Sequence, residues 1–160
     1  MDKTKFNAVE VLEMAKEIEL KGKDFYQFHA ENYSEPELSE LFLKLAKEEQ
    51  KHYDTFNELS KKAREDARDE VNYIYDYQVS AYLKNLVEFT VFPPDNELEE
   101  GIDDLEEILT IGIMAEKDSI LFYREMMEYN QGKTAEILER LVAEEKQHLM
   151  KLTNYKTELI

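Results

Sequence analysis

An eight-residue motif occurs twice in this chain, and its two copies lie 96 residues apart. The copies are Leu45-Ala46-Lys47-Glu48-Glu49-Gln50-Lys51-His52 and Leu141-Val142-Ala143-Glu144-Glu145-Lys146-Gln147-His148. Both end in Glu-x-x-His, and residues three apart on a helix share one face. Glu49 with His52, and Glu145 with His148, can therefore each hold one metal ion from a single helical turn.

Apolar residues recur at helical spacing over four stretches of the chain, residues 7–33, 34–66, 104–130 and 134–157. Only four glycines and three prolines are present among 160 residues, so few residues interrupt these helices. The capping box Ser34-Glu35-Pro36-Glu37 predicts the start of the second helix. The segment Asn130-Gln131-Gly132 predicts the end of the third helix.

The first and third helices align at an offset of 97 residues, which pairs Glu19 with Glu116 and Tyr26 with Tyr123. The chain is therefore an internal repeat of two helical hairpins, residues 7–66 and 104–157. Short links make the helices of each hairpin antiparallel neighbours, whereas the connection over residues 67–103 must cross the length of the bundle. We predict one all-α domain over residues 1–160, a four-helix bundle of two antiparallel hairpins.

The long connection carries tyrosines and a second break in the helical pattern. We predict a short helix near residues 79–87 and a break at Phe92-Pro93-Pro94. We also expect the tyrosines to cover the bundle; these are Tyr73, Tyr75, Tyr77 and Tyr82.

Four glutamates lie on the apolar stripes, one on each helix: Glu19, Glu49, Glu116 and Glu145. Burying four uncompensated carboxylates would cost several kcal/mol each or force their protonation, whereas two divalent cations would cancel the charge. The alternative is that the two histidines merely pack in the core or cap a carboxylate. Two matched copies of the motif instead favour a dinuclear site with one Glu from each of two helices and Glu-x-x-His from the other two.

Carboxylate oxygens with two imidazoles and no thiolate suit iron or manganese better than zinc or copper. We expect two iron ions, with manganese or a mixed pair as alternatives. Glu49 and Glu145 are predicted to bridge the two ions. His52 and Glu19 would complete one side, and His148 and Glu116 the other.

Three further aromatic or imidazole side chains lie near these positions in the sequence. Tyr26 and Tyr123 each follow a stripe glutamate by seven residues, so they are either core aromatics or donors that orient the carboxylates. His29 has no glutamate partner at the right spacing, and Met126 stands at its place in the repeat. We predict that His29 is partly exposed and is no ligand.

Composition excludes several classes of function. The net charge of −17 argues against partners such as nucleic acid and anionic membrane surfaces. The absence of cysteine excludes disulfides, thiolate zinc sites and iron–sulfur clusters. The chain has no long apolar run and no apolar core of a signal peptide near Met1, so we expect a soluble, cytoplasmic protein.

The two hairpins resemble the rubrerythrin-like branch of the ferritin-like diiron-carboxylate proteins. The resemblance covers roughly residues 8–65 and 104–155, and its carriers are the two copies of the motif and the pairs Glu19 with Tyr26 and Glu116 with Tyr123. It implies a ferritin-like bundle around a diiron centre that reacts with hydrogen peroxide or dioxygen, often as a homodimer.

The chain departs from this family pattern in two ways. Rubrerythrins append a rubredoxin domain, which these cysteine-free residues lack, so an external protein would donate the electrons. Rubrerythrins also add a glutamate one turn after the third-helix ligand, where this chain has Ser119. The remaining six-residue set is similar to that of bacterioferritins, but Gln50 stands where those have a haem-binding methionine, so no haem is expected.

Three functions are compatible with this pattern. The first is a diiron oxidoreductase of rubrerythrin type that reduces hydrogen peroxide or dioxygen with electrons from an external donor protein. The second is a ferritin-like ferroxidase that feeds iron storage. The third is a helical bundle in which the metal ions only stabilise the fold.

Overall fold

The computed structural model describes residues 5–33, 35–67, 74–89 and 104–158. These residues form five helices, and their only strand-like pairing is an isolated bridge between Phe6 and Tyr75. The helices are α1 (Ala8–Asn32), α2 (Pro36–Ala67), α3 (Tyr77–Phe89), α5 (Leu105–Glu128) and α6 (Gly132–Glu158). The prediction of an all-α bundle is confirmed. No described helix carries an apolar stretch long enough to cross a bilayer.

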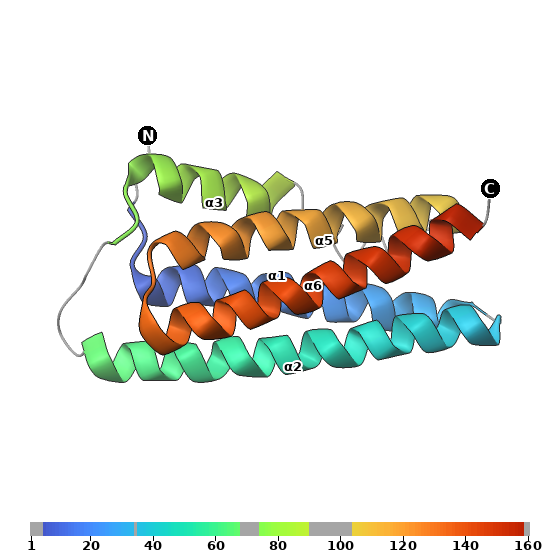
Figure 1. The fold of residues 1–160 in the computed structure, drawn as a ribbon, viewed down its shortest axis with the longest axis horizontal. Helices are drawn as coiled ribbons and strands as arrows, with labels where there is room; N and C mark the ends of the chain where they lie inside the picture. The colour runs from blue at the N-terminus through green and yellow to red at the C-terminus, as the bar shows by residue number, and fades with distance from the viewer. Residues whose placement is uncertain (1–4, 34, 68–73, 90–103, 159–160) are drawn as a thin grey trace.

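Two antiparallel hairpins lie side by side, α1 with α2 and α5 with α6 (Figure 1). Figure 1 also shows that α2 ends where α1 begins, whereas α5 begins at the opposite end of the bundle. The connection between the hairpins therefore crosses the length of the bundle, as the sequence predicted. The short helix α3 belongs to this connection and packs on α5.

Helix boundaries follow local side-chain chemistry. Asn7 caps α1 through a capping box, because its Oδ1 accepts from the Glu10 amide at 2.8 Å and Glu10 Oε1 accepts from the Asn7 amide at 3.2 Å. Asp104 caps α5 by accepting from the Glu106 amide at 3.0 Å. Ser34 lies outside the described residues, so the predicted capping box of α2 is untested.

The turn between α5 and α6 differs in detail from the prediction. α5 ends at Glu128, and the side chain of Asn130 donates to the Met126 carbonyl at 2.7 Å, which satisfies an acceptor of the last turn. Gly132 has a φ of +62°, which favours glycine, and it begins α6 instead of ending α5.

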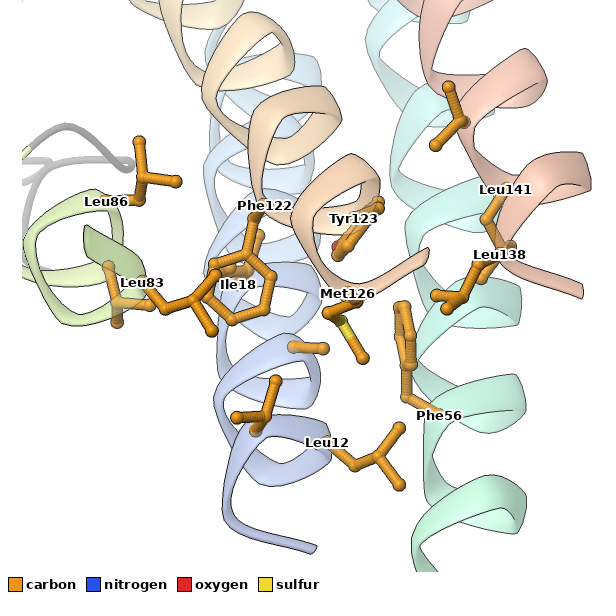
Figure 2. Packing of buried hydrophobic residues seen from close by; sticks show 14 of the residues in the cluster. Leu12, Ile18, Phe56, Leu83, Leu86, Phe122, Tyr123, Met126, Leu138 and Leu141 are labelled. Atoms are coloured by element: carbon orange, nitrogen blue, oxygen red, sulfur yellow. The ribbon is translucent and has the colours of Figure 1, made fainter. Parts of the chain in front are cut away.

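Buried apolar residues form two clusters. The α3-side cluster, part of which is drawn in Figure 2, contains Val11, Leu12, Ala15, Ile18, Phe56, Tyr75, Leu83, Leu86, Val87, Phe122, Tyr123, Met126, Leu138, Leu141 and Val142. The opposite cluster contains Phe25, Tyr26, Ala30, Leu38, Phe42, Leu45, Ala46, Ile108, Leu109, Ala115 and Leu152. Along each long helix, the buried glutamates and histidines of the repeated pattern come between members of the two clusters. A polar layer is thus held between two apolar ones.

The tyrosines of the connection cover the bundle to different degrees. Tyr75 is buried, and its hydroxyl accepts from Asn130 Nδ2 at 3.0 Å. Tyr77 and Tyr82 are 50% and 39% exposed, so they cover the bundle only in part. The inner side of α3 is aliphatic instead, and Figure 2 shows Leu83 beside Phe122. Tyr73 and Phe92-Pro93-Pro94 lie outside the described residues.

Candidate metal centre

All six predicted ligand residues meet in the polar layer, and none is more than 3% exposed. They form two overlapping groups, in each of which the ligand atoms lie within 4.8 Å of one another. One group contains Glu19, Glu49, His52 and Glu145, and the other contains Glu49, Glu116, Glu145 and His148. Glu49 and Glu145 belong to both groups, which is the position that bridging carboxylates would need.

The first group is organised around Nδ1 of His52. This nitrogen lies 2.8 Å from Glu145 Oε1 on α6 and 3.5 Å from Glu19 Oε2 on α1. Glu49, one turn before His52 on α2, places its Oε1 at 3.9 Å. Three helices therefore present one carboxylate each to one imidazole.

The second group repeats this arrangement around Nδ1 of His148. This nitrogen lies 2.9 Å from Glu49 Oε1, 3.3 Å from Glu145 Oε2 and 3.5 Å from Glu116 Oε1. The rings of His52 and His148 stack with centroids 5.7 Å apart. The internal repeat of the sequence thus produces two equivalent halves of one centre.

Unsatisfied polar atoms test whether this centre fits metal ions. Within the described part of the chain, five buried atoms of the centre make no hydrogen bond of good angular geometry, although His148 Nδ1 and Glu49 Oε1 lie close together: Glu19 Oε2, Glu49 Oε1, Glu116 Oε2, Glu145 Oε2 and His148 Nδ1. Each such atom would cost free energy if left unpaired. Octahedral ligands at ~2.1 Å from a cation lie about 3 Å from one another, which matches the separations around both histidines. The residues therefore fit two divalent cations.

Two buried tyrosines hold the outer glutamates from opposite sides. The Tyr26 hydroxyl donates to Glu116 Oε1 at 2.6 Å, and the Tyr123 hydroxyl donates to Glu19 Oε1. Each tyrosine thus binds the glutamate of the other hairpin, as the donor alternative requires. A Cβ at Gly112 would lie 3.2 Å from Leu152 Cδ1, closer than an ordinary contact, so the glycine leaves room for Leu152 beside Tyr26.

Comparison with known proteins agrees with this geometry. The profile of the rubrerythrin family matches residues 10–156. The chain belongs to the rubrerythrin family. This rubrerythrin-family chain also matches the crystal structure of a protein from Thermotoga maritima described as a ferritin-like diiron-carboxylate protein. The two are 28% identical, the match covers 97% of each chain, and the TM-score is 0.76. Among proteins of curated function, none matches the sequence.

Two glutamates that the sequence analysis did not single out complete the centre of this rubrerythrin-family protein. Glu144 Oε2 lies 3.0 Å from Nε2 of His52, and Glu48 contacts Nε2 of His148. Both contacts join one hairpin to the other. In both, the Nδ1 atom of the histidine ring remains directed at the ligand carboxylates. The sequence did contain a signal, since a second glutamate precedes the predicted ligand in both copies of the motif.

We expect Glu48→Ala and Glu144→Ala to weaken metal binding by about 10- to 100-fold each, because the histidine rings would lose the carboxylates that fix their orientation. Competition with a chromophoric chelator measures the affinity. Glu40→Ala, an exposed glutamate on α2, is the matched control. Unchanged affinity in both test variants would contradict the orienting role.

Protons balance the charge of the buried centre when no metal is bound. Burial and repulsion by neighbouring carboxylates raise the pKa of Glu49 and of Glu145 well above the usual range. Burial also acts to raise the pKa of Glu19, but His52 outweighs it and lowers that pKa to about 2. Burial opposes the charge on His52, yet Glu19 and Glu145 raise its pKa to about 12. The pKa of His148 is raised in the same way.

Loading two divalent cations near neutral pH should therefore release about four protons per chain, one each from two carboxyl groups and two imidazolium rings. Metal affinity should fall as the pH is lowered, because protons and metal ions compete for the same atoms. Calorimetric titration in buffers of different ionisation enthalpy counts the protons. If no protons are released, the two carboxyl groups and the two imidazole rings are already deprotonated in the metal-free protein.

His29 is buried, with only 2% exposed, so the prediction of partial exposure is wrong. Its ring packs edge-on against Phe25 and Phe28, at centroid distances of 4.6 and 5.2 Å, and Nε2 has no hydrogen-bond partner among the described residues. The repeat contained the signal, because its counterpart Met126 is fully buried. His29 belongs to neither group of ligand residues.

Burial lowers the pKa of His29 from 6.5 to about 4. The folded state then keeps the ring neutral while the unfolded state binds a proton, so stability is lost as the pH falls from about 6.5 to about 4. We expect His29→Phe to remove up to about 3 kcal/mol of this acid destabilisation. Urea unfolding of the metal-free parent and of the metal-free His29→Phe variant, at pH 7 and at pH 4, measures this difference. If the free energy of unfolding falls equally with pH in both proteins, the prediction is wrong.

Proposed function

We propose that this protein is a diiron-carboxylate oxidoreductase that reduces hydrogen peroxide or dioxygen with electrons from an external donor. The observation that carries the proposal is the pair of overlapping groups, each with three carboxylates and one imidazole, inside the core of a rubrerythrin-family bundle. The matching protein from Thermotoga maritima is described as a diiron-carboxylate protein, which supports iron as the metal. The donor set would also hold manganese.

The six residues would bind the two ions according to the two groups of ligand residues. Glu19 and His52 would bind one ion, Glu116 and His148 the other, and Glu49 and Glu145 would be shared. Bound iron would supply the electrons, one from each ferrous ion, for reduction of the oxidant.

The rest of the protein positions these ligands and keeps water out. Tyr26 and Tyr123 hold the outer glutamates by hydrogen bonds, and Glu48 and Glu144 hold the imidazole rings. The α3-side cluster and the opposite cluster close the polar layer from both ends. Ligands held in place in this way would need little reorganisation when the charge of the centre changes.

The proposed reaction needs an electron donor outside these 160 residues. The 160 residues contain no cysteine, and therefore cannot hold the thiolate-bound iron of a rubredoxin. We propose a separate redox protein as the donor. The homodimer and the cytoplasmic location remain predictions, and a sizing measurement in solution tests the first.

The ferroxidase function is the second candidate, and Ser119 favours it. Ser119 occupies the place where rubrerythrins have a further glutamate, and its hydroxyl donates to the Ala115 carbonyl at 3.0 Å. It is a buried residue of α5 that adds no carboxylate to the centre. A protein with the six-residue set alone could oxidise ferrous ions for storage, which additionally requires assembly into a hollow cage.

Stopped-flow mixing of the ferrous protein with hydrogen peroxide or with dioxygen tests the proposal. We expect iron oxidation whose rate increases with oxidant concentration, followed by repeated turnover when a reductant is supplied. Glu49→Gln serves as the inactive control. Iron that binds but is oxidised no faster than free ferrous ions would instead assign it a structural role.

A further inference from the structure

A pocket of about 340 Å³ opens between α2 and α6, on the outer side of His52. Its wall includes Glu48 and Glu144, the two carboxylates that contact the outer nitrogens of the histidines. The pocket therefore borders the metal centre without containing any of its carboxylate ligands. Its volume is at the lower end of the range for small-molecule sites.

Three cationic side chains line this pocket: Lys51, Arg140 and Lys151. Among the described residues, none of the three lies within 4 Å of a carboxylate oxygen. The two carboxylates in the same wall are each engaged by a histidine ring. Three cations around one pocket exceed the two carboxylates in its wall, a local excess of positive charge in a chain of net charge −17.

A second pocket provides the contrast. It lies between α1, α2 and α3 and is also lined by three cations, Lys21, Arg64 and Lys84. Each of these has a carboxylate partner, Glu17 at 3.2 Å, Glu13 at 2.9 Å and Glu88 at 3.9 Å respectively. The cations of the second pocket are thus paired within the protein, whereas the three cations beside His52 have no carboxylate within 4 Å among the described residues.

Lys151 lies close to a second ammonium group, that of Lys44. Burial and Lys44 lower the pKa of Lys151, and the attraction of Glu48, which acts to raise it, does not offset them. An anion bound between these side chains would relieve their repulsion and form charge-assisted hydrogen bonds. Thr55 and Gln147 add neutral hydrogen-bonding groups to the same wall.

We propose that this pocket binds a small oxyanion, either a phosphate or a polycarboxylate. Lys51, Arg140 and Lys151 are the residues that would bind it. The anion would lie against His52 and Glu144 and would therefore approach the metal centre from the side of its imidazoles. The proposal does not depend on redox activity, because the pocket and its charges are present without any metal.

The test is an NMR titration of the metal-free, isotopically labelled full chain with inorganic phosphate and, separately, with malonate, at constant ionic strength. We expect saturable shifts confined to the amides and side chains around Lys51, Thr55, Arg140 and Gln147. Binding of phosphate alone would assign the site to phosphate groups, and binding of malonate alone would assign it to polycarboxylates.

Variants decide whether the pocket is responsible. Arg140→Gln and Lys151→Gln should each weaken binding by about tenfold, since each removes one charge-assisted contact. Lys84→Gln removes an equal charge from the second pocket, and it should leave the affinity unchanged. The proposal is overturned if neither anion saturates, if the shifts spread over the surface, or if all three variants bind alike.

Discussion

Glu49→Gln is expected to abolish tight binding of two metal ions while the metal-free fold survives. Glu49 belongs to both groups of ligand residues, so its loss affects both ions. Its raised pKa keeps the carboxyl protonated in the metal-free state, and glutamine is a neutral group of the same shape. The variant should therefore unfold at the same or a slightly higher urea concentration than the metal-free parent.

Metal analysis after dialysis against iron or manganese measures this effect. Glu19→Gln should have a smaller effect, because Glu19 belongs to one group of ligand residues only. We expect this variant to bind one metal ion per chain in place of two. Glu40→Gln, which removes an exposed carboxylate from the same helix as Glu49, should cost none. If Glu49→Gln still binds two ions per chain, the shared role of this residue is wrong.

Metal loading is expected to raise the free energy of unfolding by several kcal/mol. A ligand that binds only the folded state stabilises it by about 4 kcal/mol when present at 1,000 times its dissociation constant, and two ions contribute separately. The gain is large here because the metal-free centre buries four carboxyl groups, of which Glu49 and Glu145 are held protonated at neutral pH.

Urea unfolding with and without manganese, which avoids oxidation during the measurement, gives the difference. The parent chain should show a clear shift in midpoint, and Glu49→Gln should show almost none. Equal midpoints for the loaded and metal-free parent would mean that the cations do not bind inside the bundle.

The arrangement of the six candidate ligands could be predicted because helices have a fixed period. Once apolar residues define the buried stripe of each helix, a residue such as Glu19 must point into the bundle wherever the helix lies. The repeat then places the second hairpin in equivalent register. This placement depends neither on the crossing angles of the helices nor on the loops.

Contacts between hairpins could not be predicted in the same way. The pairing of His52 with Glu144, and of Tyr26 with Glu116, joins residues about 90 positions apart and depends on the relative height of the helices. The burial of His29 depends likewise on how α2 packs on α1. The ring centroids of His29 and of Phe42 on α2 lie 6.2 Å apart. Sequence spacing describes one helix at a time, so these contacts require the packed structure.

The number of ferrous ions that each chain oxidises is the most direct measure of whether the bundle encloses a diiron redox centre. The metal-free protein is loaded with increasing ferrous iron without oxygen and then exposed to air, and the oxidised iron is counted. Saturation at two ions per chain is the expected result. No oxidation, or oxidation that continues far beyond two, would contradict a closed diiron oxidoreductase and would leave a structural metal site or a storage protein instead.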